Sequence, residues 1–261
     1  MYAFSYSNPQ TAGEAASASG QFLAGGQSLI PSMKLRLAQP GAIVDLNGVA
    51  ELAGIRVSGA QLEIGAMTRH ADVAASREVQ AAIPALAQLA GGIGDRQVRA
   101  RGTIGGSLAN NDPAACYPSA VLGLGATVVT HQREIAADDF FQSMYTTALQ
   151  EGELITAVRF PVPRAAAYLK FKQPASRFAL VGVFVAQTAQ GVRVAITGAG
   201  LSVFRHEGLE AALNQSFTPE AAAAVKIDDS ELNSDLHASA RYRAQLISVQ
   251  TQRAVEQLLS P

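Results

Sequence analysis

The sequence predicts an α+β fold with two domains, and three patterns support that prediction. Short apolar strands alternate with alanine-rich helical segments as far as residue 160. Beyond it come three apolar runs, the last two joined by a short turn, which predict an antiparallel sheet. From residue 240 to 258, apolar and small residues recur at spacings of four and three, which predicts an amphipathic helix that backs this sheet.

The domain boundary is expected at Pro161–Ala167, where prolines block a helix and small residues follow, as in a linker. We therefore expect an N-terminal domain of residues 1–163, with subdomains of about 1–54 and 55–163, and a C-terminal domain of residues 164–261.

Each element follows from its local sequence. Apolar and polar residues alternate around Ser58-Gly59, which predicts a hairpin with one solvated face. Pro84 interrupts an alanine-rich helical stretch that Gly91-Gly92 closes. In order, we expect a helix at 11–19, a strand at 21–24, a helix at 29–37, a strand at 42–46, a hairpin at 55–66, helices at 68–76, 78–89 and 117–124, a strand at 126–130, a helical turn at 138–141, strands at 153–160, 168–172, 179–187 and 192–198, and the terminal helix.

An anion site is expected where an apolar strand runs into Gly25-Gly26 and then into a helix with Pro31 in its first turn. Adjacent glycines allow backbone conformations in which successive N–H groups converge on one negative oxygen. The helix that follows adds unpaired N–H groups and the positive end of its dipole, and Ser28 is a suitable N-cap.

A second segment, Thr103-Ile104-Gly105-Gly106-Ser107, has the same design. A single Gly-Gly pair is common in ordinary turns, but two such loops indicate a ligand with two phosphates, a dinucleotide. The preceding stretch, Asp95–Arg101, carries three arginines. It is either a solvated basic turn or a segment in which an arginine neutralises phosphates or fixes the loop through bidentate hydrogen bonds to a carboxylate.

Composition narrows the class of function. A formal net charge of -1 offers no basic surface for nucleic acid or for an anionic membrane. No apolar run reaches the ~18 residues of a spanning helix and the N-terminus lacks signal-peptide features, so we expect a cytoplasmic protein without membrane insertion. Cys116 is the only cysteine, so this chain alone cannot hold an iron–sulfur cluster, and the four histidines lack ligand spacing and are expected to be mostly solvated.

Common catalytic and nucleotide motifs are absent. The segments Gly123–Val128 and Gly198–Val203 lack the third glycine of a Rossmann fingerprint, and no segment matches a P-loop. Ile30 replaces the second glycine that a nucleophile elbow around Ser28 would need. A self-contained hydrolase or metalloenzyme therefore has little support.

Over nearly its whole length the chain resembles the FAD-binding subunits of molybdenum hydroxylases, including the medium subunit of carbon monoxide dehydrogenase and the flavin domain of xanthine dehydrogenase. Ala24–Leu29 resembles the first flavin loop of that family and Thr103–Ser107 the second. Gly152–Ile155 and Tyr168–Lys172 are supporting stretches. The resemblance implies a two-part FAD-binding domain of the PCMH or vanillyl-alcohol-oxidase type, followed by the smaller C-terminal domain.

The same resemblance implies cofactors and partners. FAD would place its pyrophosphate on the two glycine loops and its isoalloxazine ring toward the C-terminal domain. A large subunit would carry a molybdopterin cofactor and a small subunit two 2Fe–2S clusters, in a dimer of heterotrimers. Electrons would pass from the clusters to FAD and on to NAD, a quinone or oxygen. The chain would be an oxidoreductase subunit without the site that oxidises the organic substrate.

Individual residues around the flavin are implied as well. Lys172 falls where a family lysine approaches the ring and would stabilise the reduced flavin; a solvated strand lysine is the alternative. Ile155 falls at an aliphatic contact or is strand core, and Phe178 packs on the ring or belongs to the core. Ile93 stands where xanthine dehydrogenases carry a phenylalanine, and Cys116 where aspartate is common.

Asp112 or backbone groups would then replace the hydrogen bond that Cys116 cannot supply. No residue is assigned to catalysis or to a metal. The expected cofactor-binding residues are Leu23, Ala24, Gly25, Gly26, Gln27, Ser28, Leu29, Ile30, Ile93, Thr103, Ile104, Gly105, Gly106, Ser107, Asp112, Cys116, Ile155 and Lys172.

Two other functions stay open. One is a stand-alone flavoprotein reductase or oxidase with its own substrate pocket, against which the lack of an acid–base pair near either loop counts. The other is a structural subunit that bridges its partners without flavin, against which the intact glycines count.

Overall fold

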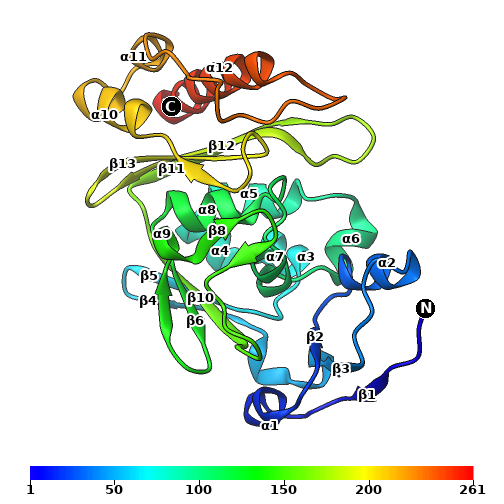
Figure 1. The fold of residues 1–261 in the computed structure, drawn as a ribbon. Helices are drawn as coiled ribbons and strands as arrows, with labels where there is room; N and C mark the ends of the chain where they lie inside the picture. Colours follow the sequence, from blue (N-terminus) through cyan, green and yellow to red (C-terminus); the bar gives the residue numbers. More distant parts are fainter. Residues whose placement is uncertain (261) are drawn as a thin grey trace.

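A computed structural model describes residues 1–260, in which three larger sheets and one small hairpin are surrounded by helices (Figure 1). The helices are α1 (Ala12–Ser17), α2 (Leu29–Lys34), α3 (His70–Ala75), α4 (Arg77–Ala82), α5 (Pro84–Gly91), α6 (Arg96–Arg101), α7 (Ile104–Asn110), α8 (Tyr117–Gly123), α9 (Ala137–Phe140), α10 (Glu207–Gln215), α11 (Pro219–Ala223) and α12 (Ala240–Leu259), with the 3-10 helices η1 (Leu46–Gly48) and η2 (Ala50–Leu52). The strands are β1 (Ser5–Ser7), β2 (Gln21–Leu23), β3 (Ala42–Asp45), β4 (Ile55–Ser58), β5 (Gln61–Gly65), β6 (Thr127–Thr130), β7 (Glu134–Ala136), β8 (Phe141–Ser143), β9 (Thr146–Thr147), β10 (Ile155–Pro161), β11 (Ala165–Lys172), β12 (Ala179–Thr188), β13 (Gly191–Thr197) and β14 (Phe204–Arg205).

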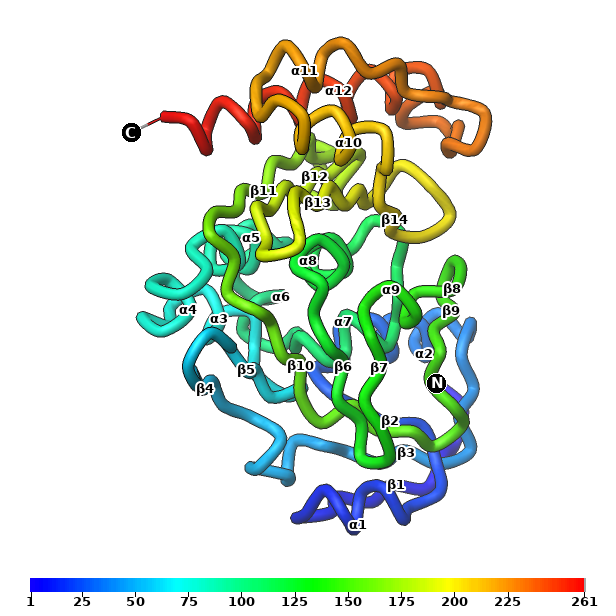
Figure 2. The backbone as a smooth tube through the Cα atoms, turned by 90° about the vertical axis from the view of Figure 1, so that its left-hand side faces the viewer, coloured from blue at the N-terminus to red at the C-terminus, as the bar shows by residue number. Residues whose placement is uncertain are grey.

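The first sheet is small and parallel, in the order β1-β3-β2. Helices α1 and α2 make the connections between its strands, as parallel pairing requires. Its buried residues form a cluster with Met67 and Leu154, which come from the next part of the chain. The sheet therefore packs on the rest of the protein through shared apolar contacts and lies at the lower end of the molecule (Figure 2).

The second sheet is antiparallel, in the order β4-β5-β10-β6-β7. The hairpin expected at residues 55–66 is present as β4 and β5, and β10 lies between β5 and β6. Helices α4, α7 and α9 contact this sheet, and together with α3, α5 and α8 they supply about half of the largest apolar cluster, which contains Leu86, Leu89, Ile104 and Tyr117.

The third sheet, β11-β12-β13-β14, is covered on both faces. Helices α10 to α12 lie on one side and α5 and α8 on the other (Figure 1). Side chains alternate along β12, so Val183 and Val185 join the cluster under α12 while Phe184 and Ala186 join the cluster with α5 and α8. Burial on both faces explains why Ala179–Ala186 is apolar without alternation.

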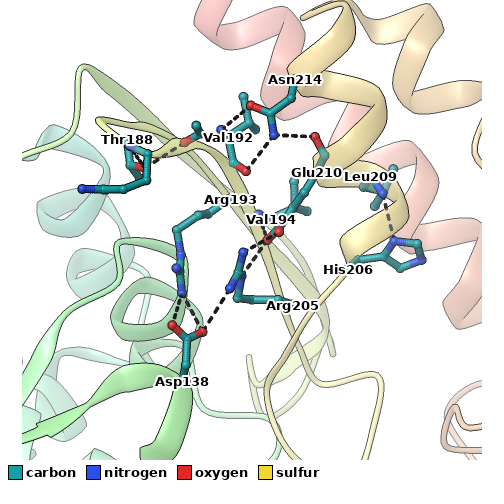
Figure 3. Close-up of polar contacts among 12 residues, drawn as sticks. Asp138, Thr188, Val192, Arg193, Val194, Arg205, His206, Leu209, Glu210 and Asn214 are labelled. Atoms are coloured by element: carbon teal, nitrogen blue, oxygen red, sulfur yellow. Dashed lines mark hydrogen bonds and ion pairs between the residues drawn. The ribbon is translucent and has the colours of Figure 1, made fainter.

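Polar contacts also connect the third sheet to the N-terminal part (Figure 3). Arg193 on β13 donates to Asp138 on α9 at 2.8 and 2.9 Å, and to the carbonyl of Leu122 at the end of α8. Arg205 on β14 donates to Glu210 and, at 3.3 Å, to Asp138. Although partial burial opposes its charge, these two arginines hold the pKa of Asp138 below its usual value.

Several expected boundaries differ from the structure. Helix α2 ends at Lys34, and Ser28 precedes it without a side-chain capping bond. Thr68 caps no helix, because its hydroxyl donates to the carbonyl of Gly54 instead. The expected linker is limited to residues 162–164, because β11 already begins at Ala165. The arginine-rich stretch 96–101 is helix α6, which Asp95 caps through Val98 N–H.

The large apolar cluster crosses the expected domain boundary, since it includes Tyr168, Phe184 and Ala195. Within residues 1–260, no helix combines the length and the apolar character needed to cross a bilayer. The same residues bring together no group of three or more His, Cys, Asp or Glu side chains suited to a metal ion.

Candidate cofactor site

A cavity of about 1250 Å³ lies where the first sheet, the α6–α7 region and one end of the third sheet meet. It is larger than the ~300–1,000 Å³ of most ligand pockets, and a dinucleotide needs such room. Its walls come from seven stretches of chain: residues 16–32, 38–46, 66–70, 93–116, 145–155, Lys170 and 176–178.

The first glycine segment lines this cavity and carries backbone donors without an acceptor in the described chain. Among the described residues, none accepts a hydrogen bond from the backbone N–H groups of residues 25–29, whereas Ile30 N–H donates to Gly26 at 3.2 Å and starts the ladder of α2. Gly26 has a φ of 74°, which favours glycine. Five successive free N–H groups at a helix N-terminus are suited to a pyrophosphate.

Gly25 has a different task, which is close packing. A Cβ atom there would lie 1.9 Å from the carbonyl oxygen of Arg101 and 2.8 Å from Gly102 Cα. The first loop therefore rests directly on the turn that leads into α7. The absence of a side chain at Gly25 sets the distance between the two glycine segments.

The second glycine segment does not have the design expected from its sequence, because it forms the first turn of α7. Ile104 and Gly105 N–H donate to the carbonyls of Thr68 and Ala66, at 3.1 and 2.8 Å. Gly106 N–H donates to Thr103 Oγ1 at 3.1 Å, the capping bond of the helix. These donors are already used, so the segment offers the cavity the Ser107 hydroxyl, which has no partner among residues 1–260, rather than a row of free N–H groups.

Most of the expected residues do line the cavity. They are Ala24, Gly25, Gly26, Gln27, Ser28, Leu29, Ile93, Thr103, Gly105, Gly106, Ser107, Asp112, Cys116 and Ile155. Ile104 belongs to the apolar core instead. Leu23 and Ile30 lie behind Gly26, where a Cβ atom would meet their side chains at 3.5 and 2.5 Å.

Lys172 also lies outside the set that lines the cavity, and it is exposed. The pairing of β11 with β12 shifts between Phe171 and Lys172, which breaks the alternation of side chains at that point. The lysine at the cavity is Lys170, two residues earlier. Phe178 also lines the cavity and is 49% exposed, so it is not a core residue.

Three cationic side chains hold the cavity loop that follows α5. Lys170 Nζ donates to Gly92 O at 2.8 Å, Arg99 to Ile93 O at 2.9 Å, and Arg177 to Gly94 O at 3.3 Å. Within the described chain none of the three forms a salt bridge with a carboxylate. Lys170 and Arg177, which line the cavity, therefore give this end positive charge that no salt bridge pairs. Within the described chain Arg99 forms no bidentate bond to a carboxylate, and the loop that it holds through carbonyls is the one after α5, not a glycine segment.

Lys170 also contacts Cys116, whose Sγ lies 3.4 Å from Nζ. Cys116 is buried at the start of α8. Asp112 is half-buried on the same wall and accepts from Ala114 N–H at 2.8 Å. Burial raises the pKa of Asp112 despite this hydrogen bond.

His70 departs from the expectation that the histidines are mostly solvated. It lines the cavity with only 5% of its surface exposed, and its ring packs 5.3 Å from that of Tyr117. Burial, with a smaller contribution from the positive charge of Arg99, lowers its pKa to about 4. The imidazole is therefore neutral near pH 7 and adds no charge to the cavity.

Comparison with known proteins gives the ligand of such a cavity. Residues 2–163 match the family model described as "FAD binding domain in molybdopterin dehydrogenase". The chain belongs to this family. It is 37% identical to the carbon monoxide dehydrogenase medium chain of Hydrogenophaga pseudoflava, over 97% of this chain and 96% of that one. It is 34% identical to the glyceraldehyde dehydrogenase medium chain of Sulfolobus acidocaldarius, over 90% and 89%.

A solved structure agrees with this membership. Reconstituted CO dehydrogenase from Oligotropha carboxidovorans contains a chain that superposes with a TM-score of 0.91 at 32% identity, over 98% of each chain. The resemblance proposed from the glycine segments is thus confirmed. This FAD-binding subunit is part of an oxidoreductase of the molybdenum hydroxylase type, and its relatives are medium chains of multi-subunit enzymes.

The residues present fit FAD. The free N–H groups of residues 25–29 and the hydroxyls of Ser28 and Ser107 would hold the pyrophosphate. Glycine at position 26 accommodates the φ of 74° that this loop adopts. Neutral small residues at one end, including Ala18, Gly20 and Ala42, and the cationic loop at the other offer two different environments for the two ring systems.

Cavity residues that were not anticipated from sequence include Lys170, Arg177 and Tyr145. Lys170 lies in the stretch Tyr168–Lys172 that the resemblance singled out, but alternation along a strand puts Lys170 and Lys172 on the same face, and the bulge that separates them is visible only in the structure. Tyr145 had no local signal, because it reaches the cavity through a hairpin turn.

Proposed function

We propose that this chain is the flavin subunit of a heterotrimeric molybdenum hydroxylase. In the proposed complex it receives electrons from 2Fe–2S clusters on a small subunit, which takes them from a molybdopterin cofactor on a large subunit. A dimer of heterotrimers is the proposed assembly. Bound FAD supplies the chemistry, because it accepts electrons and passes them to an external acceptor.

The observation that carries the proposal is the row of five free N–H groups at residues 25–29, facing a cavity large enough for a dinucleotide. These groups bind and orient the pyrophosphate, while Gly25 fixes their position against Arg101. The chain's own sites for substrate chemistry are missing from this picture. His70, the histidine that lines the cavity within the described chain, is buried and neutral near pH 7, because its pKa is lowered to about 4.

The proposed orientation places the isoalloxazine ring at the end that Lys170, Arg99 and Arg177 surround. Reduced flavin carries negative charge near neutral pH, and uncompensated cations stabilise an anion in a partly buried site. Lys170 lies on β11 and Arg177 in the turn between β11 and β12, so the ring would face the C-terminal part of the chain. The uncharged end near Ala18 and Ala42 suits the adenosine.

The proposal is tested by purifying the chain from its native host under conditions that keep complexes intact. Released FAD, partner subunits identified by mass spectrometry, and molybdenum and iron in the complex are the expected results. Colourless protein in an intact complex would support the bridging role without flavin. FAD-dependent turnover of an organic substrate by the isolated chain would support the stand-alone reductase.

A further inference from the structure

Strained backbone is concentrated beside the cavity. In the described chain, four residues other than glycine have positive φ: Arg36 (62°), Asn111 (40°), Tyr145 (54°) and Arg177 (63°). Tyr145 and Arg177 line the cavity, and Asn111 is hydrogen bonded to Tyr145. Such backbone persists where the surroundings enforce it, and it is found preferentially at ligand sites.

Tyr145 occupies a turn position that normally suits glycine. Strands β8 and β9 pair through Ser143 and Thr146, so Met144 and Tyr145 are the central residues of the turn. Positive φ at the second central position favours glycine or asparagine. A tyrosine that is 59% exposed gains little burial in return. Its side chain therefore has a use that the turn itself does not explain.

A buried asparagine holds this turn in place. Asn111 is completely buried, and its Nδ2 donates to Ser143 O and Thr146 O, both at 2.8 Å. Tyr145 N–H donates back to Asn111 O at 3.1 Å. Because Asn111 ends α7, the turn is attached to the helix that carries the second glycine segment.

From this turn, Tyr145 contributes to the cavity wall. Partial burial and the negative charge of Asp112 both raise the pKa of Tyr145. Asp112 itself lines the cavity. Tyr145 therefore lines the cavity near Asp112 and stays partly exposed.

We propose that Tyr145 is a cofactor-contacting residue that covers the mouth of the cavity and packs its ring against bound FAD. Asn111 is the positioning residue that holds it there. This inference rests on the proposed function, since it requires FAD in the cavity. The strain at Tyr145 is then the cost of placing an aromatic ring where a plain turn would use glycine.

The test compares Tyr145→Gly with Tyr145→Phe in the full-length chain, with FAD affinity measured by titration and fluorescence. Tyr145→Gly relieves the strained backbone, so a residue with only a turn role would give an unchanged or higher melting temperature and unchanged FAD affinity. We expect instead an FAD dissociation constant about tenfold higher or more. Tyr145→Phe keeps the ring and should stay within about threefold of the wild type.

Arg36→Gly is the matched control, because Arg36 has the same backbone strain but does not line the cavity. Its FAD affinity should not change. Tyr145→Asn, which also tolerates positive φ, repeats the test if the glycine variant folds poorly. Wild-type affinity in both ring-less variants would overturn the inference. A wild-type chain that binds no FAD would instead overturn the proposed function.

Discussion

Replacing Gly25 by alanine should separate the two glycine segments and release FAD. A Cβ atom at Gly25 would lie 1.9 Å from Arg101 O, whereas such contacts are essentially never below 3.0 Å. One segment must therefore move by about 1 Å, which takes a hydrogen bond of ~2.9 Å beyond its useful range. The turn below is held by Gly102 N–H to Val98 O at 2.8 Å and by His70 N–H to Gly102 O at 2.9 Å, so the first loop is the part that moves.

The size of the effect follows from the donors on that loop. A hydrogen bond to a charged group contributes about 1.5–3 kcal/mol, and losing two to the pyrophosphate would cost about 3–6 kcal/mol. The FAD dissociation constant should then rise by about 10²–10⁴-fold. Fluorescence titration of the full-length chain measures this, and thermal unfolding of the FAD-free variant shows whether the fold is kept.

Two further glycines calibrate the result. In Gly26→Ala the alanine must adopt positive φ, which costs about 1–2 kcal/mol, but the only close side chain, Ile30, can rotate away from the new Cβ atom. The Gly26→Ala variant should therefore lose less FAD affinity than Gly25→Ala. Gly13→Ala, in α1, meets no atom within 4 Å and should leave FAD binding unchanged. A natively folded Gly25→Ala protein that binds FAD like the wild type would refute the reasoning.

Three other predictions concern charge. Lys170→Met should lower the reduction potential of bound FAD by tens of millivolts, since about 30 mV corresponds to 1.4 kcal/mol, and a spectroscopic redox titration measures this shift. Lys172→Met is the matched control, and an equal shift in both variants would contradict the placement of the ring. Because the pKa of His70 is about 4 in the folded chain and ~6.5 in the unfolded chain, the unfolded chain binds the proton more readily. The free energy of unfolding is therefore highest above pH ~6.5, and it should fall by about 3 kcal/mol as the pH drops through about 4. Denaturant unfolding of His70→Phe should lack this part of the loss, and an unchanged pH profile would show that His70 is not its source. Asp138→Asn should lower the free energy of unfolding by only about 0.5–1 kcal/mol, because Asp138 is half-exposed and solvent screens its ion pairs with the third sheet. The resulting drop in melting temperature should be smaller in high salt. Equal drops at low and high salt would argue against an electrostatic origin.

Local patterns were sufficient for most elements of the fold. Alternation predicted β4 and β5, and spacing of four and three predicted α12, because each pattern reflects a single buried face. The sequence did not predict the helix ends that depend on tertiary contacts. Helix α2 ends at Lys34 where Arg36 adopts positive φ, and Thr68 bonds to Gly54, a partner distant in sequence.

The cofactor site was predictable only in part for a similar reason. Most of the residues named from the resemblance line the cavity, and glycines are recognisable in any sequence. Whether their N–H groups are free depends on neighbours such as Thr68 and Ala66, which accept from the second segment. Tyr145 is placed at the cavity by a turn that Asn111 holds through hydrogen bonds to Ser143 O and Thr146 O, and no local sequence pattern predicts such long-range hydrogen bonds.

The two-sided burial of β12 bears on how such chains can be recombined. A fragment cut near residue 163 would leave Phe184 and Ala195 without α8, and α8 without the sheet that covers it. Gly123 strengthens this dependence, because a Cβ atom on α8 would come within 2.9 Å of Phe184. A chimaera built from two relatives should therefore exchange α5 and α8 together with the third sheet, so that the shared interface is inherited from one parent.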